Sequence, residues 1–408
     1  MLKLNLEHSR ADVEKVQAEI KRIKEVPIPD FARYRTNLVE IERVTQKYMH
    51  YKNIIVVGNG GAINFFRGFY HSLARGKVSK NVEILNTVEP DYINELKAKY
   101  SPSNTLIVIV SKSGTNPTAM EILFGFKEYP KLAVCTEGEN ALFKIVQKEK
   151  WDYTTYPTPQ ELPHLEDRHT GFMASGLTPA ALVGIDIVEL CEGANIMYDK
   201  CAPNVPIENN PALCLAATLY ALDLKGFTEI FCPVYSTKLY GFLPGMIQLL
   251  HETACKEGKG QTIFGDLAPE SQHHTNQRFF GGRKDILGLF IHAGQDDEES
   301  KVSIPSELFE LKIRGGNLKY FEGIPYSKLL EFEFQGTVRD AIDKNIPIIT
   351  IELEKVSPKS VGMFLALFQY VSVYLAHLNN VNPLGQPQVE KGKDISFELV
   401  KKYSLEDR

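Results

Sequence analysis

The sequence predicts an α/β protein with two doubly wound parallel sheets, each layered between helices in an αβα arrangement. Short β-branched runs alternate with helical stretches along most of the chain, which is typical of this class. The runs are apolar throughout, as expected of parallel strands buried on both faces. The chain of 408 residues also exceeds the roughly 250 to 300 residues that a single hydrophobic core serves, so we expect two domains.

Residues 1–50 are expected to form a helical arm. Apolar residues recur at spacings of three and four between Ala11 and Lys24, which predicts an amphipathic helix. Pro27 ends this helix, and a second amphipathic stretch follows over residues 38–48. We expect the arm to pack against the body of the fold.

Residues 51–200 are expected to form the first α/β domain. A strand, a glycine turn and a helix open it at Asn53, and an apolar helix over residues 179–191 closes it. The expected strands cover residues 53–57, 82–85, 105–110 and 131–135.

Residues 201–380 are expected to form the second α/β domain, and residues 381–408 a polar, basic C-terminal tail. The second domain opens on a linker rich in proline and asparagine over residues 201–210. Its expected strands cover residues 229–234, 285–291 and 346–352, and its expected helices include residues 212–224 and 360–378.

Composition and charge indicate a soluble protein and argue against nucleic acid and membranes as partners. The formal net charge of −5 gives no general attraction to nucleic acid or to an anionic membrane, so an anionic ligand needs a local site. The six cysteines lack CxxC or Cys/His ligand spacing, which indicates free thiols. The N-terminus resembles no secretion signal and no window approaches 18 apolar residues, so we expect a cytoplasmic protein that binds no membrane.

A hydroxyl-rich segment, Ser111-Lys-Ser-Gly-Thr-Asn-Pro-Thr118, follows the third strand and precedes a helix. Hydroxyls and backbone N–H groups at a helix N-terminus bind anions. The alternative, a helix capped by Thr118 with Glu121 as its partner, leaves the other hydroxyls unexplained. Because the P-loop pattern is absent, the segment favours a phosphorylated small molecule over a nucleoside triphosphate. The residues predicted to hold the phosphate are Ser111, Lys112, Ser113, Thr115 and Thr118.

The turn Gly58-Asn-Gly-Gly-Ala62 after the first strand differs from a dinucleotide fingerprint. Ile63 stands where the GxGxxG pattern needs its third glycine. Glycines here let the backbone approach a ligand or another loop closely, and a tight turn without a ligand is the alternative. On the first interpretation, Gly60 and Gly61 are candidate substrate-binding residues.

The stretch Leu249–Lys284 holds the candidate acid and base groups. Glu252 ends an apolar helix, where partial burial would raise the pKa of its carboxyl and suit it to proton transfer. A solvated ion pair with Lys256, four residues on, is the alternative. The adjacent His273 and His274 are candidate acid–base groups, because histidine titrates near neutral pH. The acidic residues around them do not have the spacing of a zinc site, so we expect no metal.

Four blocks of the chain, in this order, resemble those of the phosphoglucose isomerase family of SIS-domain sugar isomerases. They are SKSGTNPTAME from Ser111, HETACKEGKG with Glu252, HHTNQ with His273 four residues before Gln277, and NPLGQPQVEKGK with Lys393. The resemblance implies reversible isomerisation of glucose 6-phosphate and fructose 6-phosphate, a step of glycolysis and gluconeogenesis, through a cis-enediol intermediate. It also implies that no metal or organic cofactor takes part, and that the protein is a homodimer whose ring-opening histidine comes from the neighbouring subunit.

The same resemblance implies a role for each matching residue. Glu252 carries the proton between C2 and C1 of the sugar. His273 opens the sugar ring together with Lys393, and His274 is the alternative histidine. Gln386, in the last block, contacts the substrate near its phosphate.

Two departures from the family pattern leave other functions open. Met173 stands where the family carries the arginine that stabilises the charged intermediate, so Arg168, Arg278 or Arg283 would have to supply that charge. Ala62 replaces a serine of the glycine turn. The alternatives are a bifunctional enzyme that also takes mannose 6-phosphate and a non-catalytic protein that binds a sugar phosphate.

Overall fold

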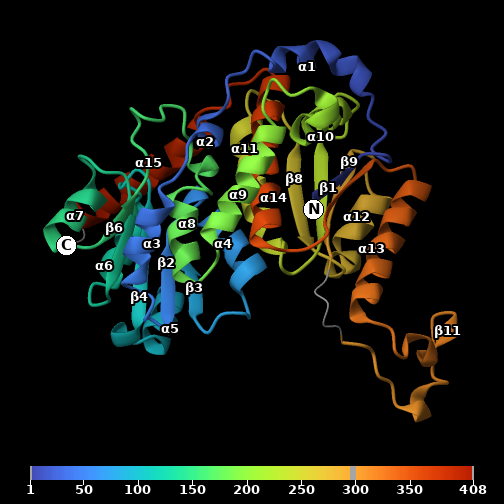
Figure 1. Cartoon of the computed structure of the whole chain (residues 1–408), viewed down its shortest axis with the longest axis horizontal. Helices are drawn as coiled ribbons and strands as arrows, with labels where there is room; N and C mark the ends of the chain where they lie inside the picture. Colours follow the sequence, from blue (N-terminus) through green and yellow to red (C-terminus); the bar gives the residue numbers. More distant parts are fainter. Residues whose placement is uncertain (1, 295–299, 407–408) are drawn as a thin grey trace.

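The computed structural model describes residues 2–294 and 300–406, and two five-stranded sheets form its centre (Figure 1). All pairings in the first sheet are parallel. Its strands are, in spatial order, β3 (Asn81–Leu85), β2 (Asn53–Val57), β4 (Thr105–Ser111), β5 (Lys131–Cys135) and β6 (Tyr153–Thr155).

The second sheet is parallel except at one edge, where β1 pairs antiparallel with β12. Its strands are, in spatial order, β1 (Leu2–Asn5), β12 (Ile348–Leu353), β9 (Ile286–Ala293), β7 (Glu229–Tyr235) and β8 (Thr262–Leu267). A further two-stranded hairpin joins β10 (Lys312–Ile313) to β11 (Gly316–Asn317). The predicted class, two parallel α/β units, is confirmed.

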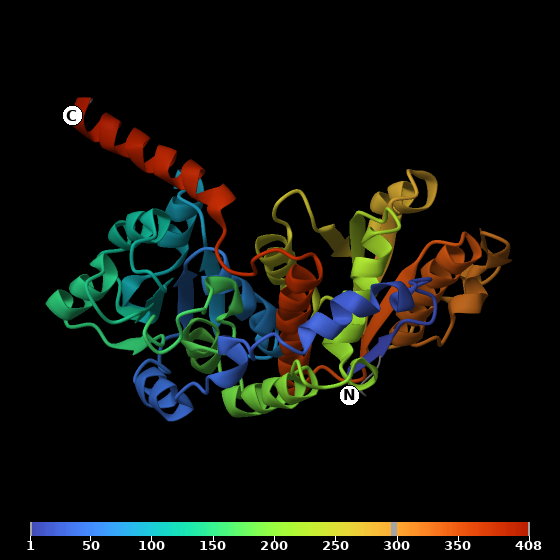
Figure 2. The ribbon, with the colours of Figure 1, turned by 90° about the horizontal axis from the view of Figure 1, so that it is seen from above.

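Helices cover the faces of both sheets (Figures 1 and 2). The first unit carries α4 (Gly61–Phe69), which a π-helical turn extends over Tyr70–Ala74, and α5 (Pro90–Lys99), α6 (Pro117–Gly125), α7 (Ala141–Glu149) and α8 (Ala174–Leu182). The second unit carries α10 (Pro211–Asp223), α11 (Leu243–Ala254), α12 (Thr275–Gly281), α13 (Tyr326–Asp343) and α14 (Pro358–Leu378).

The two units share one hydrophobic core. A single cluster of buried side chains runs from Ile54 and Val108 of the first sheet to Ile349 and Leu353 of the second. Helix α9 (Ile187–Lys200) packs along α14 within this cluster.

Helix α14 is long and apolar enough to cross a membrane by length and composition, contrary to the expectation that no window would approach that limit. It is buried inside the protein over 94% of its apolar window. A helix that is apolar on all sides is expected when neighbours surround it, so we interpret α14 as the central core helix.

The N-terminal arm is only partly helical. It contains α1 (Gln17–Ile23), α2 (Asp30–Arg33) and α3 (Leu38–Gln46), but its first residues form strand β1. The expectation of a purely helical arm was wrong because β1 is a four-residue edge strand with one pairing partner, and its side chains alternate between more and less exposed positions. Such short amphipathic strands give a weaker signal than the apolar runs of central strands.

Other boundaries also differ from the sequence prediction. The helix expected over residues 179–191 is split into α8 and α9 at Gly184, which has φ +79°. The edge strands β6 and β8 were missed, because β6 has three residues and β8 contains Gly265 and Asp266. The polar tail forms α15 (Pro387–Glu406), a helix that leaves the body of the protein (Figure 2).

Candidate active site

The predicted phosphate loop lies where the chain reverses direction across the first sheet. From β2 the chain proceeds to β3 on one side, whereas from β4 it proceeds to β5 on the other. In open parallel sheets, the carboxyl ends of two such strands enclose a crevice where ligands bind. The hydroxyl-rich loop follows β4 and the glycine turn follows β2, so both predicted segments border this crevice.

The loop presents hydroxyls and a lysine. Ser111 is the buried last residue of β4, whereas Ser113 and Thr115 are exposed, with their hydroxyl oxygens 3.1 Å apart. The ammonium group of Lys112 donates to the carbonyl oxygen of Leu165. The alternative role of Thr118 as N-cap was wrong: Asn116 caps α6 by accepting from the N–H of Ala119 at 3.1 Å.

The glycine turn allows close approach between protein segments. Gly60 has φ +57°, and a Cβ on it would lie 2.9 Å from Nε2 of Gln248. A Cβ on Gly61 would lie 2.2 Å from the carbonyl oxygen of Asp167. The protein itself thus accounts for both glycines, and their contact with substrate stays a prediction.

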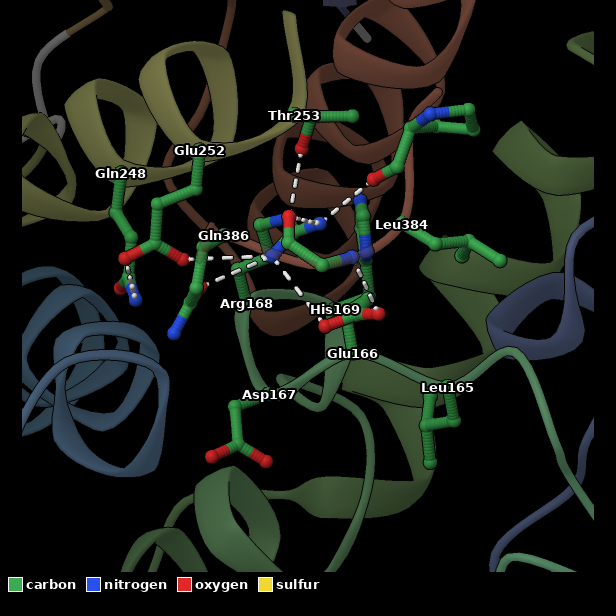
Figure 3. Close-up of polar contacts among 12 residues, drawn as sticks. Leu165, Glu166, Asp167, Arg168, His169, Gln248, Glu252, Thr253, Leu384 and Gln386 are labelled. Atoms are coloured by element: carbon green, nitrogen blue, oxygen red, sulfur yellow. Dashed lines mark hydrogen bonds and ion pairs between the residues drawn. The ribbon is translucent and has the colours of Figure 1, made fainter. Parts of the chain in front are cut away.

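Glu252 lies on α11 with its side chain 24% exposed. Burial raises the pKa of this carboxyl, while Arg168 and a hydrogen bond from Gln248 oppose the rise. Gln248 donates to Oε1 at 3.1 Å, and Nη1 of Arg168 lies 3.5 Å from Oε2 (Figure 3). The alternative partner Lys256 instead donates to the carbonyl oxygens of Asn382 and Leu384.

Arg168 is fully buried and connects three segments of the chain. Its Nε donates to Oγ1 of Thr253 at 2.9 Å, and its Nη2 donates to the carbonyl oxygen of Pro383 at 2.6 Å. Its Nη1 donates to Oε1 of Gln386 at 3.1 Å and lies 3.4 Å from the carboxylate of Glu166 (Figure 3).

Of the three arginines that the sequence left open, Arg168 is the one that lies beside Glu252. Met173 is buried in the hydrophobic core, whereas Arg168 contacts the carboxylate of Glu252 directly. The other two candidates lie elsewhere: Arg278 pairs with Asp285 and Glu229 beside the second sheet, and Arg283 follows it on an exposed loop. That Arg168 supplies the charge expected at the position of Met173 stays a prediction.

Two adjoining cavities meet at Gln386. One, of about 540 Å³, is lined by Lys112 and Ser113 of the phosphate loop and by Asp167. The other, of about 290 Å³, is lined by Glu252 and Lys256. Because Gln386 lines both, Ser113 of the predicted phosphate loop and the candidate base Glu252 line neighbouring cavities of the size that small ligands occupy.

His273, His274 and Lys393 lie outside this space in a single chain. His273 lines a third cavity, of about 490 Å³, between the segment Glu270–His273 and α13, and this cavity shares no lining residue with the other two. The Nε2 of His274 lies 3.6 Å from Asp266. Lys393 is exposed on α15, where it pairs with Glu390 at 2.8 Å.

The sequence prediction missed several residues of the site. Gln248 lies one turn before Glu252 on the same face of α11, a spacing that helical periodicity could have flagged. Asp167 carries no comparable local signal. In residues 2–294 and 300–406 no group of three or more His, Cys, Asp and Glu side chains is arranged to hold a metal, and all six cysteines are free.

Comparison with known proteins gives the chain clear relatives. No protein-family model matches it. It is 28% identical to a probable glucose-6-phosphate isomerase of Haloarcula marismortui, covering 86% of this chain and 78% of that protein. It is 26% identical to a glucose-6-phosphate isomerase of Methanocaldococcus jannaschii, covering 86% and 85%. Its fold is similar to that of a glucose-6-phosphate isomerase of Chlamydia trachomatis, with a TM-score of 0.77 at 16% identity, covering 99% and 89% of the two chains.

Proposed function

We propose that this chain, which is homologous to the glucose-6-phosphate isomerases, interconverts glucose 6-phosphate and fructose 6-phosphate. The observation that carries the proposal is the pairing of a partly buried Glu252 with the fully buried Arg168, beside a cavity lined by the phosphate loop. A coupled assay of the purified protein with fructose 6-phosphate tests it directly. Absence of product at any protein concentration would overturn it.

The proposed chemistry is a proton transfer between adjacent carbons. Glu252 removes the proton from C2 of the open-chain aldose as O1 is protonated, which gives a cis-enediol intermediate, and then returns a proton to C1 as O2 loses its hydroxyl proton. Burial raises the pKa of its carboxyl, which brings the base closer to neutral pH and favours both steps. Arg168, whose charge is buried beside Glu252, stabilises the negative charge that develops on the sugar oxygen.

The phosphate of the substrate is held by Ser111, Lys112, Ser113, Thr115 and Thr118 in this proposal, with Gln386 between phosphate and sugar. Gln386 lines both adjoining cavities, which supports this role. The reaction draws on side chains alone and needs no metal or organic cofactor. We place the protein in the cytoplasm, in glycolysis and gluconeogenesis.

Removing the loop hydroxyls is expected to weaken substrate binding. The double variant Ser113→Ala/Thr115→Ala keeps the backbone but loses two exposed donors, so KM for fructose 6-phosphate should rise at least roughly tenfold, since each hydrogen bond to a charged group contributes about 1.5 to 3 kcal/mol. Because both side chains are exposed, folding should be unaffected. Ser103→Ala is the matched control, because its exposed hydroxyl lies 3.0 Å from that of Ser101 at the opposite, amino end of β4. An unchanged KM would remove the loop from the site.

We further propose that the active enzyme is a homodimer, because ring opening needs residues that one chain does not bring to the cleft. Every side chain of α15 from Pro387 to Leu405 is exposed, and the helix leaves the body of the protein (Figure 2). Helices in proteins gain most of their stability from packing of an apolar face, so a second copy of the chain is the partner we propose for the apolar side chains of α15. These are Val389, Ile395, Phe397, Leu399, Val400, Tyr403 and Leu405.

Hybrid dimers test the shared site. A Glu252→Gln chain paired with a His273→Ala chain forms one site with both residues intact, if His273 comes from the neighbour. Mixed dimers should then recover roughly a quarter of wild-type activity, because half of the dimers are hybrids and each has one intact site. Each variant alone, at the same concentration, is the control. Hybrids confirmed by mass spectrometry that stay inactive would contradict a shared site, as would a fully active monomer.

Two alternative functions are separated by experiment. The non-catalytic interpretation was motivated by Met173, and the contact between Arg168 and Glu252 supports the catalytic interpretation instead. Activity toward mannose 6-phosphate depends on the same acid and base groups, so the same assay with that substrate decides it.

A further inference from the structure

A short chain of hydrogen bonds reaches Glu252 from the first α/β unit. Asn64 on α4 donates through Nδ2 to Oε1 of Gln248 at 2.9 Å. Gln248 on α11 in turn donates through Nε2 to Oε1 of Glu252 at 3.1 Å (Figure 3). Residues four apart on a helix lie on one face, so Gln248 is next to Glu252, whereas Asn64 comes from 184 residues earlier in the chain.

The direction of these bonds matters for the base. A side-chain amide has one accepting and one donating end, and a carboxylate only accepts. If the amide of Gln248 were reversed, its oxygen would face the carboxylate of Glu252 and repel it. Asn64 presents a donor to that oxygen and so favours the orientation in which Gln248 donates to Glu252.

The packing around Gln248 leaves space for this arrangement. At Gly60, the absence of a side chain leaves room for the amide, because a Cβ there would lie 2.9 Å from Nε2. Asn64 follows four residues later, at the start of α4. Gly60 therefore leaves room for the side chain of Gln248, and Asn64 orients its amide.

We propose that Asn64 is a positioning residue of the isomerase, which fixes the amide of Gln248 so that it donates to the catalytic base Glu252. The proposal rests on the proposed function only in naming Glu252 as the base. Asn64 itself need not touch the substrate. The hydrogen bond it secures stabilises the ionised form of Glu252, and loss of that bond would favour the protonated form.

Several charged groups also act on Glu252 and would be unchanged by substitution of Asn64. Arg168 and Lys256 are the cations, and Asp167 and Glu166 are the nearby acids. Because these four charged groups are unchanged in a variant of Asn64, a change in the pKa of Glu252 can be attributed to the hydrogen bonds that run from Asn64 through Gln248.

The test is the variant Asn64→Leu, which is close in size but cannot donate. The pKa of Glu252, followed by carbon-13 NMR of the substrate-free protein, should rise by roughly half to one unit. The acid limb of the kcat profile should move upward by the same amount, since the base works only when deprotonated, and KM should stay within roughly twofold. Asn64→Ala gives a second variant should the first fold poorly.

Two comparisons separate positioning from a structural effect. In a Gln248→Leu background, Asn64→Leu should have no further effect on the pKa of Glu252, because coupled residues are not additive. Asn59→Leu, at an asparagine of the same turn that donates to the carbonyl oxygen of Asn86, should leave that pKa unchanged. An unshifted pKa in both Asn64 variants, or additive shifts with Gln248→Leu, would overturn the inference. Because the NMR titration needs no substrate, a protein without isomerase activity would refute the proposed function separately.

Discussion

Turnover of fructose 6-phosphate is expected to fall by at least roughly 10²-fold when Glu252 is replaced by glutamine, while the substrate still binds. Glutamine preserves the size of the side chain and an oxygen that can accept from Arg168, but that oxygen cannot take up the C2 proton. Exchange of solvent tritium into fructose 6-phosphate should disappear together with turnover. Helix α11 holds the side chain of Glu252 in a fixed direction, and the side chain is partly shielded from water. Both properties suit Glu252 to act as the base.

The matched control is Glu270→Gln. Glu270 lies in the same stretch of sequence but is exposed and lines neither of the two adjoining cavities. Its replacement should leave exchange and turnover nearly normal. If exchange persists in Glu252→Gln and disappears in Glu270→Gln, the base has been misassigned.

The pH dependence of the wild-type enzyme follows from the environment of Glu252. Burial raises the pKa of its carboxyl above the ordinary glutamate value. A base is active only when deprotonated, so kcat should fall as the pH drops through this raised pKa, and the acid limb should lie above the pH at which an exposed glutamate titrates. In the Glu252→Gln variant the residual activity should lack this limb.

Replacing Arg168 by lysine is expected to lower kcat by roughly 10²- to 10³-fold, the loss typical of a preorganised donor at a developing charge. Lysine keeps the positive charge, but its compact ammonium group cannot reproduce the planar fork that reaches Thr253, Pro383 and Gln386 together. The acid limb of the kcat profile should also move slightly upward, because the hydrogen bond from Arg168, which lowers the pKa of Glu252, is lost while the positive charge remains.

The control for Arg168 is Arg278→Lys. Arg278 forms ion pairs with Asp285 and Glu229 outside the adjoining cavities, so its replacement should leave kcat and the acid limb nearly unchanged. Thermal unfolding of both variants shows whether either change acts through stability. Turnover within roughly threefold of wild type in folded Arg168→Lys would exclude Arg168 from stabilising the intermediate.

The sequence by itself determined the fold class and the central strands. Strands β2, β4, β5 and β7 are apolar runs buried on both faces, and a strand of that kind carries its signal in consecutive residues. The hydroxyl-rich loop was singled out as a candidate from local sequence, since it joins a strand to a helix, and the structure places it after β4 and before α6. Glu252 was singled out by its place at the end of an apolar helix together with the family resemblance. The central strands, the loop and the helix end are each recognised from residues that lie close together in the sequence, within about one helical turn or one strand.

The tertiary structure decided what depends on distant neighbours. The edge strand β1 gains its role only by pairing with β12, which is 345 or more residues away. Arg168 was one of three candidates in the sequence, and only its contacts with Glu252 and Gln386, respectively 84 and 218 residues later in the chain, distinguish it. The pairing of Asn64 with Gln248 is of the same kind. Local propensity and periodicity contain no information on such contacts, because folding brings the partners together through packing that the whole chain determines.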